Sequence, residues 1–210
     1  MSILVERIPN RPIDSNSFVI YTKANNSCIV VDPGTENCTD LIEFIEKNRF
    51  KPEHIFLTHE HFDHIWGVTK LKETYNCKIV SSLECSLRIV DSKKNMSLFY
   101  NQIGFETYPG DIHIEEINHN LEWNNKKIEF ISTKGHSNAS ICILIDNHLF
   151  SGDTIIKNIK TVIKLPCGSK EKLIKSLSIL NNKFLNKSIM VHSGHGESFW
   201  YEEIKNQKLL

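Results

Sequence analysis

Short runs of β-branched and aromatic residues alternate with amphipathic helical patterns along the chain, and this alternation limits the possible folds more than any other feature. The strand-like runs end in polar or glycine turns; they cover residues 15–22, 27–34, 54–58, 77–82, 127–133, 140–146, 148–153 and 188–194. The helical patterns cover 39–50, with Thr39 as the expected N-cap, 67–75, 170–184 and 198–210. This order of elements favours an α/β architecture of stacked layers.

Composition narrows the classes of function. The 210 residues carry 25 Lys and Arg against 25 Asp and Glu, so the strongly basic face of a nucleic-acid binder is not expected. No apolar run approaches the roughly 18 residues that span a bilayer, and the first residues do not form a signal peptide. The six cysteines form no CxxC pair and are expected to be reduced. We therefore expect one catalytic domain over residues 1–210, in the cytoplasm, with no nucleic-acid or membrane partner.

The chain also has ten histidines, and several of them are organised. Residues 58–64 read THEHFDH, a pattern HxHxDH that follows a strand-like run and leads into a helix. In a strand, His59 and His61 would point to the same side, and the next turn would bring Asp63 and His64 close to them. Imidazole and carboxylate groups at this spacing are typical ligands of zinc, iron and similar ions. The pattern predicts a metal site.

Three more residues able to bind a metal stand at the ends of later strand-like runs, each beside a glycine. They are His136, Asp153 and His195. The carboxyl ends of strands are where layered α/β proteins gather their ligands. Taken singly each residue is weak, but together with HxHxDH they predict one shared site.

This constellation resembles the metallo-β-lactamase superfamily, which includes glyoxalase II-like thioester hydrolases. The resemblance covers nearly the whole chain, in the family's order: Asp32-Pro33-Gly34, THEHFDH, Gly135-His136, Gly152-Asp153-Thr154 and Gly194-His195-Gly196. It implies the family's αββα sandwich of two mixed β-sheets flanked by helices, with a metal site at one edge. Asp32 is expected to hydrogen-bond the loop of the site without binding a metal.

The resemblance also implies the ligand set. His59, His61 and His136 would bind a first ion, Asp63, His64 and His195 a second, and Asp153 would bridge the two. We expect two divalent ions, zinc first, with iron or manganese as alternatives. The other histidines, which match no ligand position, are His54, His113, His119, His148 and His192.

The activity implied is that of a binuclear metal-dependent hydrolase. Hydroxide shared by the two ions would attack the acyl carbon of a small ester or thioester, and Asp63 would orient it as the catalytic residue. A mononuclear iron persulfide dioxygenase, a lactonase, a phosphodiesterase and a metal-binding module without catalysis stay open as alternatives on the same ligands. Oligomeric state is not readable from the sequence.

Two segments are candidates for substrate recognition. Residues 84–118 are the least regular part and could form a cap whose aromatic residues wall a pocket: Phe99, Tyr100, Phe105 and Tyr108. The alternative is a helix and loop packed on the sheet edge. The lysine-rich segment 157–172 could bind a carboxylate or phosphate, or could be ordinary solvated surface.

Overall fold

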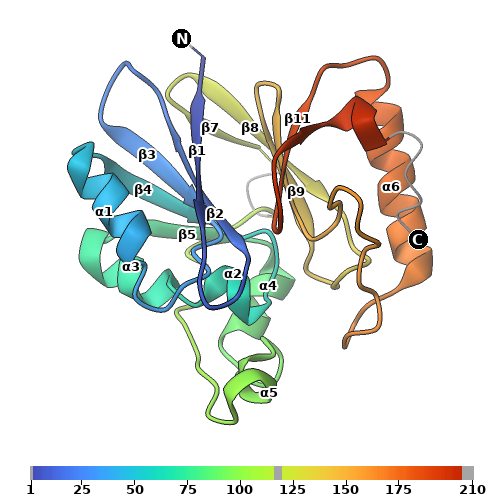
Figure 1. Ribbon diagram of the computed structural model, residues 1–210, viewed down its shortest axis with the longest axis horizontal. Helices are drawn as coiled ribbons and strands as arrows, with labels where there is room; N and C mark the ends of the chain where they lie inside the picture. Colours follow the sequence, from blue (N-terminus) through green and yellow to red (C-terminus); the bar gives the residue numbers. More distant parts are fainter. Residues whose placement is uncertain (1, 116–119, 205–210) are drawn as a thin grey trace.

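Two β-sheets pack face to face, with helices on their outer sides (Figure 1). The structure, a computed structural model, describes residues 2–115 and 120–204. Over these residues each sheet has six strands, and both sheets mix parallel with antiparallel pairs. The predicted αββα sandwich is confirmed.

The first sheet is built from the N-terminal part of the chain. Its strands lie in chain order: β1 (Leu4–Pro9), β2 (Asn16–Tyr21), β3 (Ser27–Val31), β4 (Lys51–Phe56), β5 (Lys78–Ser81) and β6 (Ile112–His113). β1 to β3 are antiparallel, whereas β3 to β6 are parallel. The helices of this part are α1 (Thr39–Lys47), α2 (Phe62–Ile65), α3 (Val68–Tyr75), α4 (Leu83–Ile89) and α5 (Ser97–Asn101).

The second sheet also keeps its strands in chain order, from β7 at one edge to β12 at the other. Its strands are β7 (Asn120–Trp123), β8 (Lys126–Ser132), β9 (Ile141–Ile145), β10 (His148–Gly152), β11 (Met190–Ser193) and β12 (Phe199–Trp200). β10 and β11 are parallel because α6 (Lys170–Phe184) lies between them in the chain and covers the outer face of this sheet (Figure 1).

Three apolar layers follow from the alternation of side chains along the strands. In β2, Val19 packs outward with the residues of α1 and α3, whereas Phe18 and Ile20 face the second sheet. There they join residues such as Phe130 and Phe150 from β8 and β10. Because both faces are covered, these strands read as nearly continuous apolar runs. The third layer lies between the second sheet and α6.

Two local predictions are wrong. α1 begins at Thr39, and its N-cap is Cys38, which has φ 49° and makes no capping bond with its side chain. The predicted helix over 198–210 is instead the strand β12, which pairs with β11, and a 3-10 turn over Tyr201–Ile204. Phe199 and Tyr201 are buried against α6, and this packing overrides the helical pattern. Residues 205–210 lie outside the described residues.

Among the helices of the described chain, none is both long enough and apolar enough to cross a bilayer.

Candidate metal centre

The loop between β4 and α2, together with α2 itself, carries the HxHxDH motif, and Asp32 anchors the start of this loop. The strand ends at Phe56, so His59 and His61 lie in a loop rather than on the predicted extension of the strand. The Asp32 carboxylate accepts the backbone N–H of Thr58 at 2.8 Å and the Thr58 hydroxyl at 2.6 Å. Asp32 therefore holds this loop through hydrogen bonds, as predicted.

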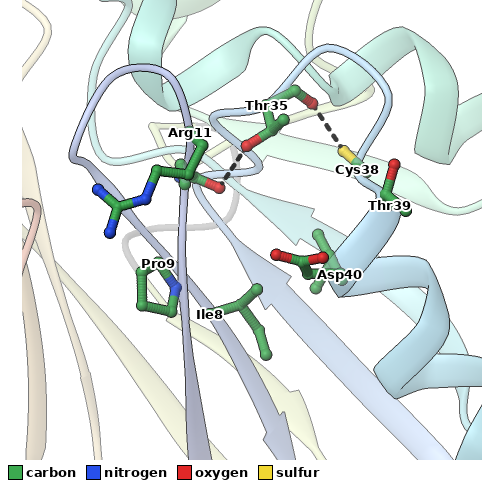
Figure 2. A pocket seen from close by; sticks show the side chains of 9 residues that line it. Ile8, Pro9, Arg11, Thr35, Cys38, Thr39 and Asp40 are labelled. Carbon is green, nitrogen blue, oxygen red and sulfur yellow. Dashed lines mark hydrogen bonds between the residues drawn. The ribbon is translucent and has the colours of Figure 1, made fainter.

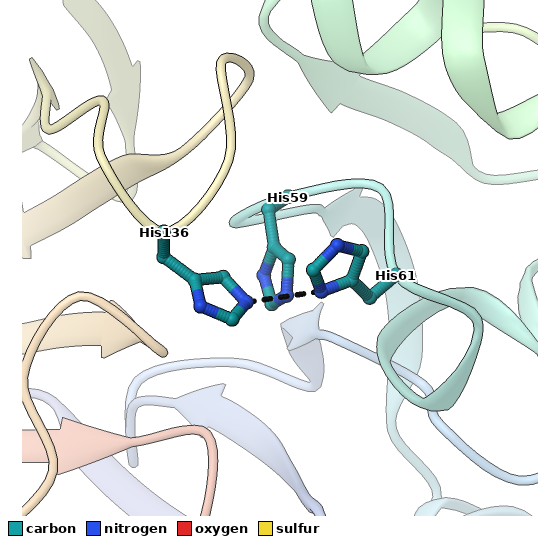
Figure 3. Close-up of side chains that lie close together, drawn as sticks. All are labelled: His59, His61 and His136. Atoms are coloured by element: carbon teal, nitrogen blue, oxygen red, sulfur yellow. Dashed lines mark hydrogen bonds between the residues drawn. The ribbon is translucent and has the colours of Figure 1, made fainter. Parts of the chain in front are cut away.

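His59, His61 and His136 converge from two loops (Figure 3). Each offers a ligand atom within 4.8 Å of the others, and all three side chains are buried. His136 follows β8, and its Nε2 lies 2.9 Å from Nδ1 of His61. These three side chains come from the two different sheets, so the group forms only where the sheets meet.

A second group consists of Asp63, His64 and His195. Nε2 of His64 lies 3.7 Å from the Asp63 carboxylate, and Nε2 of His195 lies 3.5 Å from it. Asp63 and His64 belong to α2, and His195 follows β11. This group again draws on both sheets.

Asp153 lies between the two groups. One carboxylate oxygen is 3.7 Å from Nε2 of His136 in the first group and 3.4 Å from Nε2 of His195 in the second. The other oxygen is 3.5 Å from Nε2 of His64. The predicted bridging residue thus faces histidines of both groups.

Glycines let the two loops of the second sheet approach. The Gly194 N–H donates to the Gly152 carbonyl at 2.8 Å, which ties the loop of His195 to that of Asp153. A Cβ atom on Gly194 would lie 2.2 Å from Oδ1 of Asp153, and Gly152 has φ 48°, which favours glycine. These positions have no room for a side chain.

Four of the histidines are oriented in the same way: Nδ1 donates to an oxygen outside the centre and Nε2 points inward. The acceptors of Nδ1 are the Thr58 hydroxyl for His59, Asp32 for His64, the Val162 carbonyl for His136 and the Asp14 carbonyl for His195. Carbonyl and carboxylate oxygens supply no proton, and the Thr58 hydroxyl gives its own to Asp32, so each Nδ1 carries the hydrogen. The lone pair of each neutral ring is then on Nε2. Such second-sphere bonds are characteristic of metal-binding histidines.

Several buried polar atoms at this centre lack a partner. Among the described residues, Nε2 of His59, Nε2 of His64 and Oδ1 of Asp153 are buried and form no hydrogen bond. Buried polar atoms are normally satisfied, and these three atoms face the centre, where a cation would engage them. Imidazole nitrogens and carboxylates are ligands of zinc, iron and manganese, and the residues therefore fit divalent metal ions.

The charges of the centre shift its pKa values in opposite directions. Burial, followed by the charges of His64 and the other histidines, lowers the pKa of His59 well below its usual value. Burial and the neighbouring His136 lower the pKa of His61 to about 4. Burial acts in the same direction on His64, but Asp63 and Asp153 outweigh it and raise its pKa to about 9. Burial thus favours neutral imidazoles at His59 and His61, whereas the neighbouring carboxylates favour a positive charge on His64.

Glu60, which lies between His59 and His61 in the motif, has hydrogen-bond partners of its own. Its buried carboxylate accepts Nε of Arg88 in α4 at 2.6 Å and the hydroxyl of Ser137 at 2.7 Å. Ser137 follows His136 directly, so this group links α4 to both loops of the first histidine group. The sequence does contain a signal for this role, because Glu60 is a charged residue between two predicted metal ligands.

The segment 84–118 contains most of α4, all of α5 and the strand β6. β6 pairs with β5 at the edge of the first sheet, and residues 116–118 lie outside the described chain. Phe99 and Tyr100 of α5 line a cavity together with His61 and Asp63. Phe105 instead stacks on Trp66, and the Tyr108 hydroxyl donates to Glu73. Two of the four predicted aromatic residues thus lie beside the centre.

The lysine-rich segment 157–172 approaches the centre through its backbone, since the Val162 carbonyl bonds His136. Lys157 pairs with Glu203, and Lys172 donates to Asn138. Lys160, Lys164 and Lys170 line a cavity of about 310 Å³ with the apolar side chains of this segment. Anion binding here stays a prediction.

Another cavity, of about 200 Å³, lies at the start of α1 (Figure 2). It is lined on one side by Pro9 and Arg11 and on the other by Cys38 and Asp40, and the Cys38 thiol donates to the Thr35 carbonyl at 3.0 Å. The predicted site residues are not among the described residues that line it. This cavity is separate from the centre.

The histidines without a predicted ligand role stay outside both groups among the described residues. His192 bonds His148 at 2.9 Å and Ser198 at 2.8 Å, and it stacks on Phe150. It is a packed structural residue. His119 lies outside the described residues.

Comparison with known proteins agrees with this geometry. The sequence profile described as the metallo-beta-lactamase superfamily matches residues 10–195. The chain belongs to the metallo-β-lactamase superfamily. Among its relatives is the probable metallo-hydrolase MJ0888 of Methanocaldococcus jannaschii, 33% identical over 190 residues that cover 87% of this chain and 88% of that protein.

Two further members of the superfamily extend the comparison. Hydroxyacylglutathione hydrolase 1 of Vibrio vulnificus is 32% identical over 143 residues, covering 68% of this chain and 48% of that protein. The crystal structure of the BLEG-1 B3 metallo-β-lactamase superposes with a TM-score of 0.88 at 25% identity, covering 97% of each chain. The chain is therefore similar to metal-dependent hydrolases of the metallo-β-lactamase superfamily.

Proposed function

We propose that this protein is a binuclear metal-dependent hydrolase of a small ester or thioester. The observation that carries the proposal is the position of Asp153, which lies 3.4 to 3.7 Å from histidines of both groups. A carboxylate in that position suits a bridge between two cations. The first ion would be held by His59, His61 and His136, and the second by Asp63, His64 and His195.

The protein's own groups then have distinct roles. Bound divalent ions supply a water of lowered pKa and polarise a carbonyl group. Asp63 lines the adjacent cavity, so its carboxylate can accept a hydrogen bond from the attacking water and orient it. A thiolate leaving group needs little protonation, and the proposal therefore requires no separate general acid.

Zinc is the ion we propose, with iron or manganese as alternatives, and the substrate is a small acyl compound. The likeness to a hydroxyacylglutathione hydrolase supports an acyl substrate. A cytoplasmic location, the absence of nucleic-acid and membrane partners and a single catalytic domain over 1–210 stay predictions.

The test combines metal analysis of the purified protein with a hydrolysis panel of lactoylglutathione, lactones, β-lactams and phosphodiesters. We expect two ions per chain and turnover of an acyl substrate. His59→Ala and Asp63→Ala should abolish turnover in folded protein, whereas His54→Ala, on β4 and outside both groups, should retain it.

Other results would contradict the proposal. A single iron per chain with oxygen consumption on glutathione persulfide would favour the persulfide dioxygenase. Turnover of phosphodiesters alone would show that the protein is a phosphodiesterase. Full activity of metal-free Asp63→Ala would remove the metal centre from the reaction.

A further inference from the structure

A cavity of about 250 Å³ opens directly beside the proposed metal centre. We propose that it is the acyl pocket of the enzyme and takes a short, uncharged apolar group, such as an alkyl or arylalkyl chain attached to the substrate carbonyl. This inference rests on the proposed hydrolase function and adds the substrate class to it. The lining residues beyond His61 and Asp63 are Phe62, Met96, Phe99, Tyr100 and Leu165.

The pocket is continuous with the proposed centre. His61 belongs to the first group and Asp63 to the second, so both groups reach this cavity. A carbonyl held at the centre therefore has this cavity next to it, and the substituent on its carbon can extend along the wall formed by α5.

The residues that line the cavity favour an apolar substituent. Apart from the two proposed metal ligands, none of the described residues that line the cavity carries a carboxylate, ammonium or guanidinium group. A charged substituent would lose water there without gaining a partner. Phe99 is 66% exposed and Tyr100 41% exposed, so apolar surface is available for a ligand to cover.

The wall is held in place by packing. The Tyr100 ring stacks on Phe62, with ring centroids 4.7 Å apart, and meets the edge of Trp66 at 5.6 Å. At the other end of this array Trp66 stacks on Phe105. The buried Asn95 donates to the Phe105 carbonyl at 2.8 Å and caps the turn before α5. These contacts hold α5 and the Tyr100 side of the pocket in place.

The volume of the cavity limits the size of the substituent that it can hold. Pockets that enclose whole drug-sized ligands measure roughly 300 to 1,000 Å³. At about 250 Å³ and open to solvent, this cavity suits one substituent rather than a complete substrate. The leaving group would lie outside it.

The experiment uses alkyl hydroxamic acids, which chelate metal ions through a carbonyl-like head, as probes of the zinc-loaded protein. Affinity for the aceto, butano, hexano and octano members is measured by calorimetry, without need of turnover. We expect the dissociation constant to fall by up to about fourfold per added methylene until the pocket is full, as apolar burial predicts.

Variants locate the effect. Phe99→Ala should weaken hexanohydroxamate by roughly three- to tenfold and leave acetohydroxamate unchanged, because the short probe does not reach α5. Phe99 is exposed, so its loss should not unfold the protein. Ile103→Ala is the matched control: this residue is 83% exposed, lies two residues after α5 and is not among the residues that line the cavity.

The outcomes separate the two proposals. Affinity that does not depend on chain length, or an equal effect of Ile103→Ala and Phe99→Ala, would overturn the acyl pocket. If the chain-length effect is present and lost in Phe99→Ala while no ester or thioester is hydrolysed, the pocket stands and the hydrolase function fails. Failure of acetohydroxamate to bind the zinc-loaded protein would overturn both.

Discussion

At the residue scale, the hydrogen-bond acceptors that orient the histidines matter as much for the proposed metal centre as the histidines themselves. Nδ1 of His136 donates to the Val162 carbonyl, and Nδ1 of His195 donates to the Asp14 carbonyl. Each bond fixes the tautomer and aims Nε2 at the centre. HxHxDH and the three later residues could be predicted from the sequence because side-chain type and spacing carry the signal. The two backbone acceptors could not, since any residue at position 14 or 162 has a carbonyl.

Gly194 gives a first prediction. A Cβ atom there would lie 2.2 Å from Oδ1 of Asp153 and 2.5 Å from Cε1 of His64, so Gly194→Ala must displace one of them. We expect zinc affinity to fall about 10- to 100-fold, the usual effect of disturbing the surroundings of a ligand. Competition with a chromophoric chelator measures it.

Gly196→Ala is the control in the same loop. Its Cβ would meet no heavy atom within 4 Å, but φ is 77°. It should therefore lower the free energy of unfolding by about 1 to 2 kcal/mol and leave zinc affinity unchanged. Equal zinc affinity in both variants would contradict the prediction.

His192 gives a pH prediction. Burial, followed by the charge of His148, lowers its pKa to about 3. Between pH 6.5 and about 3 the unfolded chain binds a proton at this residue and the folded chain does not. The free energy of unfolding is therefore unaffected by the titration of this residue above pH 6.5. As the pH falls below 6.5, it decreases by up to about 1.4 kcal/mol per pH unit.

Urea unfolding of the wild type and of His192→Gln at pH 7 and pH 5 tests this. The wild type should lose about 2 kcal/mol more than the variant over this interval. The titrating groups are otherwise common to both proteins except for His148, whose ring contacts His192, so the difference reports the His148–His192 pair. Parallel pH dependence would show that the ring is already protonated in the folded state.

At the scale of elements, the sequence predicts correctly a helix that is long and buries one face. The predicted helix 170–184 matches α6, whose N-cap Ser169 accepts the Lys172 N–H and whose face toward the sheet includes Leu173, Leu177 and Leu180. α4 and α5 were not predicted, because elements this short do not reveal a period. α5 in particular depends on Asn95 and Ser97 bonding the distant Phe105 backbone.

The ion pair between Arg88 of α4 and Glu60 gives a prediction for an element. Arg88→Met would leave the fully buried Glu60 carboxylate without its cation, so we expect the free energy of unfolding to fall by about 3 to 5 kcal/mol. Urea unfolding measures it, and adding Glu60→Gln should recover part of the loss.

Glu84→Gln is the matched control, because Glu84 pairs with the same arginine at 3.5 Å but on the surface. Its loss should change the stability by less than about 1 kcal/mol. If Glu84→Gln and Arg88→Met were equally destabilising, the buried pair would not be what anchors α4.

At the scale of the whole molecule, the proposed centre joins the two sheets. His59, His61, Asp63 and His64 come from the first sheet, and His136, Asp153 and His195 from the second. An ion held by ligands from both parts of the chain therefore binds only when the two sheets are packed together. Its binding stabilises the folded state by mass action.

Removal of metal should accordingly lower the melting temperature. With free zinc at about 100 times its dissociation constant the stabilisation is about 2.7 kcal/mol, which for a chain of this size corresponds to roughly 5 to 10 °C. Calorimetry with and without a chelator measures the shift. The double variant His59→Ala/Asp63→Ala should respond much less, and an equal response would place the stabilising ion elsewhere.

The division of the ligands between the sheets also has a consequence during synthesis. The four donors of residues 59–64 leave the ribosome well before His195, by on the order of ten seconds at usual rates of translation. During the first part of that time, until Asp153 is synthesised, the nascent chain presents only these four donors and lacks the Asp153 carboxylate. An ion captured early would be held by the motif alone and exchange readily. Final loading would therefore be tied to the arrival of the second sheet, so the ion kept by the enzyme would be selected when the chain is nearly complete.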